Sequence, residues 1–180
     1  VQAVAPGFRT STHNRVAVTV GGAATVNFNL ALGEVTQDVT VTSTAPQVNM
    51  TDASLGGLVS EREVRELPLN GRDWLQLTTL EAGVKGGIGQ QSAAAFSNSR
   101  AARGNGLALS ISGNRPTGNV FLVDGLVVND FDNASPGSGL NVNIGGEAVR
   151  ELRVLTNEYT AEYGGRTGGV VTAVFKWGTT

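Results

Sequence analysis

The sequence lacks several residue types that most catalytic and metal sites depend on. It contains no cysteine and a single histidine, His13, among its 180 residues. Without cysteine, the chain has no disulfide bond, no thiolate metal site and no cysteine nucleophile. His13 has no second ligand at metal-binding spacing, so we expect it to lie at the surface. A Gly-x-Ser-x-Gly elbow and a phosphate-binding loop are also missing from the sequence. We therefore predict that the chain is not an enzyme and uses no metal or other cofactor.

Charge and long apolar runs are also scarce. Charged residues make up 16% of the chain, and its formal net charge is −2. There is no basic patch of the kind that binds nucleic acid, and no block of lysine and arginine that would attract anionic lipid. No apolar run approaches the roughly 20 residues that a membrane-spanning helix needs. The first residues have neither the basic region nor the apolar region of a signal peptide, so we expect none within this sequence.

The residues that are abundant favour β-structure. The chain has 25 glycines, and asparagine, serine, threonine and valine are common. This mixture suits strands joined by many turns better than a helical bundle. The hydrophobic content of 40% is too high for a disordered chain. We predict an α+β, β-rich fold with short helices and long polar loops.

The first 44 residues have the pattern of an incomplete β-domain. Polar and apolar residues alternate at 15–20, at 24–32 and at 35–44. Alternation with a period of two predicts half-buried strands, and the glycine turns between them predict an antiparallel meander. Three or four strands are marginal for an independent sandwich. Residues 1–44 are therefore predicted to be the C-terminal strands of a partial antiparallel β-sandwich.

Residues 45–180 lack the regular alternation of the first 44 residues and are predicted to form a second domain. Ser60 and Glu63 have the spacing of a capping box, which predicts a short helix over 60–67. The stretch "GRDWLQLTTL" at 71–80 predicts a second short helix.

Long loops and short strands fill the rest of this domain. Residues 83–106 and 130–141 are polar or small with little pattern, which predicts loops. Asp124-Gly125 is a favoured hairpin dipeptide, and Gly164 is placed to end a helical turn in the left-handed conformation. We predict a small mixed central sheet with strands at 107–112, 119–123, 126–129, 151–156 and 169–175.

Three segments carry a resemblance to a known family. In chain order they read "LPLNGRDWLQLTTLEAGV", "ISGNRPTGNVFLVDGLVVND" and "EAVRELRVLTNEYTAEYGGRTGGVVTAVFKWGTT". The Asp-Gly hairpin, the E-x-x-V strand start, the Tyr-Gly turn, the double glycine and the closing K-x-G-T are together similar to the plug domain of TonB-dependent outer-membrane receptors. The preceding residues contain "APGF" and "LALGEVTQDVTVTSTAP". They resemble the end of a carboxypeptidase-regulatory-like β-domain, which precedes the plug in large members of that family.

The resemblance implies a role in transport. Residues 45–180 would be the plug that occludes an outer-membrane barrel of about 22 strands. A TonB-like energy transducer would move the plug from the periplasmic side. The strand at 169–175 would lead into the barrel, whose strands are not among these residues, and no substrate is indicated. The positions that match the plug motif are Asp124, Gly125, Tyr163, Gly164, Gly168 and Gly169.

One segment ahead of the plug resembles the TonB box, with which the transducer pairs. It consists of Gln37, Asp38, Val39, Thr40, Val41, Thr42 and Ser43. Alternating valine and threonine has high strand propensity, and an unpaired strand edge accepts a partner strand through backbone hydrogen bonds. The alternative is that this segment is an ordinary third strand of the β-sandwich.

Several loop residues are candidates for ligand contacts. Arg100, Arg103 and Arg115 lie in or beside the predicted loops. In the family such loops face the incoming substrate, so the three arginines are candidates for meeting an anionic ligand. Salt bridges to the barrel wall or to nearby carboxylates are the favoured alternative. Asp124 is expected to serve the turn. Residues 129–133 alternate oxygen-bearing side chains but lack the later acidic residue of a calcium loop.

A structural role is the competing hypothesis. An incomplete sandwich exposes strand edges, and exposed edges recruit strands from neighbouring chains. Head-to-tail strand donation that does not close produces a filament. Under this hypothesis the chain would be a subunit of an extracellular fibre and not an outer-membrane plug.

Overall fold

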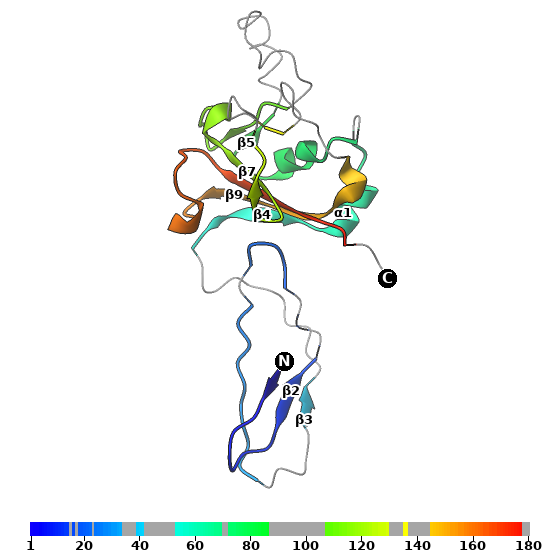
Figure 1. Cartoon of the computed structure of the whole chain (residues 1–180), viewed down its shortest axis with the longest axis vertical. Coiled ribbons are helices and arrows are strands. Elements are labelled where there is room, and N and C mark those ends of the chain that lie inside the picture. The colour runs from blue at the N-terminus through cyan, green and yellow to red at the C-terminus, as the bar shows by residue number, and fades with distance from the viewer. Residues whose placement is uncertain are drawn as a thin grey trace, which may run out of the picture. The chain divides into compact units, whose positions relative to one another are not determined.

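The computed structural model describes residues 1–14, 16, 18–22, 24–33, 39–41, 53–69, 72–86, 107–129, 135–136 and 145–177. The chain divides into two compact units, Val1–Asp52 and Ala53–Thr180, which are described separately (Figure 1). Within the described ranges, no helix has the length and apolar character needed to cross a membrane.

The first unit contains one small sheet. Its strands are β1 (Gln2–Ala3), β2 (Ser11–His13) and β3 (Val39–Val41), in the order β1-β2-β3. β1 and β2 pair antiparallel, whereas β2 and β3 pair parallel, with Thr12 opposite Thr40. The predicted meander would place residues 24–32 antiparallel beside 35–44, so the prediction was wrong for β3, which pairs parallel with β2. The long connection between them allows the chain to return in the same direction.

Two of the predicted strands in this unit are not strands at the positions that the structure describes. Strand β2 ends before the predicted 15–20, and residues 24–32 form no ladder, although Leu32 makes an isolated bridge to Phe8. The alternation in 24–32 nevertheless sets which side chains are covered. Phe28 contacts the His13 ring edge to face, with 4.7 Å between ring centroids. Half-buried and exposed positions alternate along Val26, Asn27, Phe28, Asn29 and Leu30. The pattern therefore predicted the covered face, but in the part of the chain that the structure describes no neighbouring strand completes the hydrogen bonding.

The second unit is built on a mixed five-stranded sheet. Its strands are, in spatial order, β4 (Leu55–Val59), β9 (Val149–Asn157), β10 (Val170–Phe175), β7 (Val120–Val123) and β8 (Leu126–Val127). β10 pairs parallel with β7, and the other neighbours pair antiparallel. This arrangement confirms the predicted α+β, β-rich class with a small mixed sheet. The last strand along the chain, β10, occupies the centre of the sheet (Figure 1).

The membership of the central sheet differs from the prediction at one edge. The segment predicted at 107–112 contributes β6 (Ser110–Ile111), which pairs with β5 (Val84–Lys85) in a separate two-stranded sheet. Strand β4 takes the edge position instead. Its sequence, "LGGLV", contains two glycines, and because glycine has low strand propensity the pattern did not predict a strand here. The first of them is required, because a Cβ at Gly56 would collide with the carbonyl oxygen of Val154 on β9.

Both predicted helices are present, the second as a 3₁₀ helix. Helix α1 (Glu61–Glu66) begins at Ser60, whose hydroxyl accepts from the backbone N of Glu63. The Glu63 carboxylate in turn accepts from the backbone N of Ser60 at 2.8 Å, which completes the capping box. Helix η2 (Trp74–Leu80) begins at Asp73, whose carboxylate accepts from the backbone N of Leu75 at 3.0 Å.

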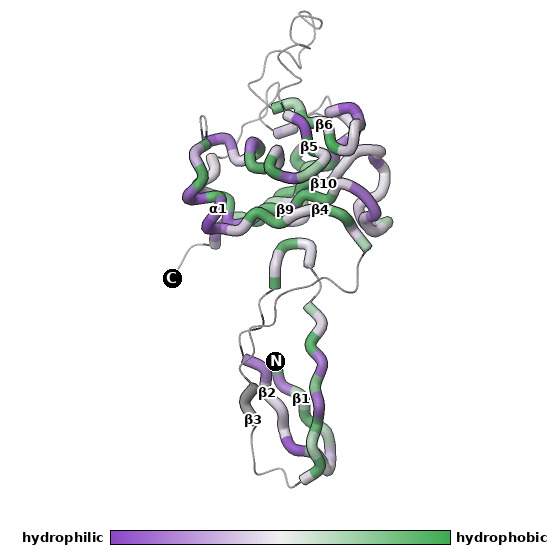
Figure 2. Tube along the Cα trace, turned by 180° about the vertical axis from the view of Figure 1, so that it is seen from behind, coloured by the Kyte–Doolittle hydropathy of each residue, from purple (hydrophilic) through white to green (hydrophobic). Residues whose placement is uncertain are grey.

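Apolar side chains cover the two faces of the sheet unequally. The larger cluster joins α1, η2 and β6 to one face, and Trp74 and Phe121 are buried in it, with 2% and 0% of their surface exposed. Figure 2 shows the hydrophobic character of β9 and β10 at the centre. The smaller cluster, on the other face, consists of Val120, Leu122, Leu155 and Val170, with Tyr159 and Tyr163 packed against them.

Three single-turn 3₁₀ helices connect the strands. They are η4 (Pro116–Gly118), η5 (Gly146–Ala148) and η6 (Ala161–Tyr163). The chain leaves η5 at Ala148 and continues directly as β9, which contains the predicted strand at 151–156. Gly164 follows η6 with φ −64°, so the predicted left-handed cap at this residue was wrong. The left-handed residue is the next one, Gly165, with φ 93°.

Candidate functional site

Most of the residues that match the plug motif lie at the two ends of the pair β7 and β10. These strands are parallel and in register, with Val120 opposite Val170. Their starts therefore lie at the same end of the sheet, where the chain segments 112–119 and 158–169 meet. Their ends lie at the opposite end, beside the β7–β8 hairpin (Figure 1).

A buried asparagine joins the two strand starts. Asn119 has none of its surface exposed, and its Oδ1 accepts a hydrogen bond from the backbone N of Gly169 at 3.0 Å. Its Nδ2 donates to the carbonyl oxygen of Leu109 at 2.7 Å. The backbone carbonyl of Asn119 accepts from Nδ2 of Asn129, whose Oδ1 accepts from the backbone N of Phe121. These side-chain amides satisfy backbone groups that strand pairing leaves open.

No motif or spacing in the sequence distinguishes Asn119 or Asn129 as a structural residue. Asparagine is common throughout this chain, so composition gives no reason to separate these two from the others. The available signal was their position: each one flanks the hairpin formed by β7 and β8, one residue before β7 and two residues after β8.

The double glycine is required by close packing at the same place. A Cβ at Gly168 would collide with Oδ1 of Asn119 and with the backbone of Gly118. A Cβ at Gly169 would collide with the Ile111 side chain and approach the Leu155 carbonyl oxygen. The backbone N of Gly168 donates to the Gly118 carbonyl oxygen at 2.9 Å, so the two loops touch through their main chains. Any larger residue would separate them.

The two tyrosines of the segment after β9 cover the smaller cluster. Tyr159 donates from its hydroxyl to the carbonyl oxygen of Gly168, and Tyr163 packs against the cluster itself. A shallow hollow of about 230 Å³ lies beside Tyr163. Its lining residues are Val120, Leu122, Val127, Glu162, Tyr163, Gly164, Gly165 and Arg166.

A second, more polar hollow brings one predicted arginine together with an unexpected one. Its volume is about 500 Å³, and it is lined by Asn114, Arg115, Thr117, Gly118, Gly165, Arg166 and Thr167. Nη1 of Arg166 donates to the Thr117 carbonyl oxygen at 3.2 Å, which ties the two loops together. Arg100 and Arg103 lie outside the described residues, so only Arg115 of the three candidates is placed.

The Asp-Gly hairpin lies at the opposite end of β7. Asp124 and Gly125 have φ values of 48° and 82°, the conformation of a two-residue hairpin turn. The backbone N of Asp124 donates to the Ala173 carbonyl oxygen at 3.0 Å. Oδ1 of Asp124 accepts from the backbone N of Phe175 at 3.2 Å. The carboxylate thus fastens the hairpin to the end of β10.

The TonB-box-like segment is placed only in its middle. Val39, Thr40 and Val41 form β3, which lies at the edge of the first unit's sheet beside β2. Gln37, Asp38, Thr42 and Ser43 lie outside the described residues. The side that β3 turns away from β2 has no partner strand within the described part of the chain.

Metal ligands are not gathered anywhere in the described residues. No group of three or more histidine, aspartate or glutamate side chains is close enough to hold a metal ion there. Of the segment 129–133, only Asn129 is described, and its amide is engaged with β7 through the two hydrogen bonds given above.

Comparison with known proteins gives one informative similarity. No protein-family model matches the chain. A stretch of 149 residues, 82% of the chain, is 27% identical to the TonB-dependent transporter Oar of Myxococcus xanthus. The chain spans only 12% of that relative's length. The chain is therefore related to a TonB-dependent transporter.

Proposed function

We propose that residues 45–180 are the plug of a TonB-dependent outer-membrane transporter, and that residues 1–44 are the last strands of a carboxypeptidase-regulatory-like domain. The similarity to a TonB-dependent transporter over 82% of the chain is the observation that carries this proposal. The division of the chain at Asp52 supports a boundary between two domains close to the predicted residue 45. The plug occludes the barrel and yields when a TonB-like transducer pulls from the periplasm.

The sheet topology suits a plug that is anchored to the barrel through its C-terminal strand. Strand β10 lies between β9 and β7, and its first four residues are buried. A segment that follows β10 into a barrel wall would hold the plug by its most firmly packed strand. Strand β10 is hydrogen-bonded to β9 on one side and to β7 on the other. Removing β10 would therefore break two ladders at once.

The edge strand β4 is held more weakly than the central strand β10. Strand β4 pairs only with β9. Of its three side chains larger than hydrogen, Leu55 and Leu58 are 57% and 41% exposed, and Val59 alone is buried at 8%. Burying one valine contributes about 1.5–3 kcal/mol, which is little for a whole strand. Because β4 is also the first strand of this unit, tension from the N-terminal side reaches it first.

The transducer would engage the segment 37–43 by strand addition. Main-chain hydrogen bonds supply the affinity in this mode of recognition, so side chains matter less than backbone N–H groups. A peptide of residues 34–46 should bind the periplasmic domain of a TonB-like transducer in a pull-down or by calorimetry. The variant Val39→Thr should bind similarly, whereas Val39→Pro should lose binding because proline has no N–H. Absence of binding by the unaltered peptide removes the box assignment.

Occlusion has its own test. A receptor that contains this chain should conduct few ions in a planar lipid bilayer, and deletion of residues 53–177 should open a wide pore. Equal conductance with and without these residues would show that they do not block the barrel.

Strand donation remains the second candidate. The observation in its favour is that β1 and β3 are both edge strands of a sheet whose strands are only two or three residues long. Electron microscopy of the purified chain distinguishes the two candidates. Long unbranched fibres support strand donation, and discrete particles support the plug.

A further inference from the structure

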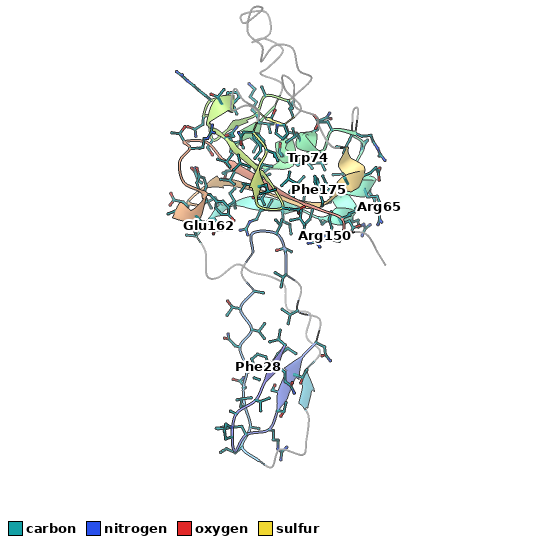
Figure 3. The ribbon with its side chains drawn as sticks, in the orientation of Figure 1. Phe28, Arg65, Trp74, Arg150, Glu162 and Phe175 are labelled. Atoms are coloured by element: carbon teal, nitrogen blue, oxygen red, sulfur yellow. The ribbon has the colours of Figure 1, made fainter. Side chains whose placement is uncertain are left out.

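Strand β4 and helix α1 form the first segment of the second unit, and both are lightly packed. Of the side chains of β4 only Val59 is buried, and α1 buries only Val64. The next element, η2, buries four side chains, Trp74 among them. Figure 3 shows Trp74 within the unit and Arg65 of α1 at its margin. The boundary between the lightly and the firmly packed parts therefore falls between α1 and η2.

The place that β4 occupies beside β9 is closely matched to this strand. The backbone of β9 comes so near that a Cβ at Gly56 would collide with the Val154 carbonyl oxygen. At Gly57 the carboxylate of Glu81 fills the position of a Cβ. A strand that replaces β4 must therefore have glycine at the position of Gly56. The β4 strand of a second copy meets this requirement.

The connection from α1 to η2 has the properties of a hinge. It is short, because it begins after Glu66 and ends at Asp73, the N-cap of η2. Arg72 lies in it with φ 59°, a left-handed conformation that is costly for residues other than glycine. Short connections under strain favour the exchange of elements between identical chains. The ion pair of Arg72 with Glu147 joins this connection to η5, but both side chains are exposed, so the pair is weak.

We infer that β4 and α1 exchange between two copies of this chain, so that each copy completes the sheet of the other. The contacts in the dimer are those already present between β4 and β9, and only the connection before η2 changes direction. A closed chain presents β4 to its own β9 at an effective concentration on the order of 1 mM, so exchange needs a protein concentration near that value. This exchange uses the second unit, unlike strand donation by residues 1–44, and it does not depend on the plug function.

The test uses the 180-residue chain at about 1 mM, incubated in urea below its unfolding transition and returned to buffer. Analytical ultracentrifugation should then show a dimer that persists after dilution, because dissociation requires β4 to leave β9. The double variant Leu58→Cys with Arg153→Cys places two cysteines directly opposite each other in a chain that has no other cysteine. A disulfide bond between these positions is within reach. Oxidised before incubation, the double variant should stay monomeric, and reduced, it should dimerise like the unaltered chain.

Chains that carry one cysteine each identify the exchanged contact. After joint incubation, the Leu58→Cys and Arg153→Cys chains should form a covalent heterodimer in a glutathione redox buffer. The control pairs Leu58→Cys with Leu126→Cys, which is equally accessible but lies on β8 at the other edge of the sheet. This mixture should give little heterodimer.

The hinge has its own variants. Arg72→Gly relieves the strain in the closed connection and should lower the dimer fraction severalfold. Glu147→Gln removes the same ion pair but leaves the backbone of Arg72 as it is, so it should not lower the dimer fraction.

Two results would overturn the inference. One is a chain that remains monomeric after every incubation. The other is a dimer of the oxidised double variant, which would mean that copies associate through exposed edges without exchanging β4. Neither result bears on the plug, because occlusion is measured in the receptor and transducer binding with a peptide.

Discussion

Oδ1 of Asn119 accepts a hydrogen bond from the backbone N of Gly169, 3.0 Å away and fully buried. The two residues are 50 positions apart in the chain, and they meet where the parallel strands β7 and β10 begin. The first residue of the motif pair, Gly168, approaches the same side chain so closely that it has no room for a Cβ. A side-chain amide and a glycine pair thus hold together the two central strands of the sheet.

Replacing Asn119 should destabilise the second unit strongly. In Asn119→Ala the N–H of Gly169 and the carbonyl oxygen of Leu109 lose their side-chain partner in a buried place, at a cost of about 2–4 kcal/mol. Urea unfolding followed by Trp74 fluorescence measures this, in a Trp177→Phe background that leaves Trp74 as the only tryptophan. Asn114→Ala is the control, because Asn114 is only partly buried and donates at 3.3 Å, and it should cost less than about 1 kcal/mol. Similar losses in both variants would contradict the role given to Asn119.

The double glycine gives a second test. Gly168→Ala forces the loops at 118 and 168 apart and should cost about 2–4 kcal/mol in the same unfolding experiment. Gly145→Ala is the matched control, because a Cβ at Gly145 would meet nothing within 4 Å. It should be neutral or slightly stabilising. If Gly168→Ala proved as harmless as Gly145→Ala, the close-packing explanation of this motif would be wrong.

The capping box predicts a defined pH dependence. Hydrogen bonds from the backbone N–H of Ser60 and then from its hydroxyl lower the pKa of Glu63 below the usual 4.5. A lowered pKa means that the ionised carboxylate stabilises the folded helix above about pH 4.5. This stabilisation is lost as the pH falls through the pKa of the folded state. The protection of the α1 amides against exchange, taken relative to the intrinsic exchange rate at each pH, should therefore decrease on acidification.

Glu63→Gln should flatten the pH dependence of the protection of the α1 amides. Glu158→Gln, which makes the same change of charge in the loop after β9, should leave it intact. A pH profile of α1 that is the same in the unaltered chain and in Glu63→Gln would exclude a contribution from this carboxylate.

The unequal packing of the sheet predicts an order of local opening. Amides of β4 should exchange faster than those of β9 and β10 under native conditions, because β4 lies at an edge and buries one side chain. Hydrogen exchange monitored by NMR measures each strand separately. Equal protection of β4 and β10 would contradict the idea of a weakly held leading edge.

Local sequence signals predicted those elements whose chemistry is contained in a few neighbouring residues. The capping box at Ser60 and the hairpin at Asp124-Gly125 formed where the sequence placed them, since each depends on contacts within five positions. Strand β10 also formed as predicted, because its run of β-branched residues suits a strand buried on both faces.

Features that depend on distant partners were not visible in the sequence. Strand β4 looked unlike a strand because of its two glycines, and the need for Gly56 is explained only by the close approach of β9. Residues 24–32 had the alternation of a strand, but no strand among the described residues pairs with them in a ladder. The bonds of Asn119 reach residues ten and fifty positions away, and the meeting of Arg115 with Arg166 depends on the same loop contact. One sequence does not reveal which of many asparagines and arginines acquire such partners.

Mechanical unfolding tests most directly whether the proposed plug opens first at its β4 edge. Since the chain has no cysteine, Ala53→Cys and Lys176→Cys provide unique attachment points for an optical-tweezers experiment that applies tension to the second unit. We predict a first event at low force whose released length corresponds to β4 and α1, residues 55–66. A second event at higher force should then release β7, β9 and β10. A single event that unfolds the whole unit, or an early release of β10, would contradict a plug that yields from its β4 edge.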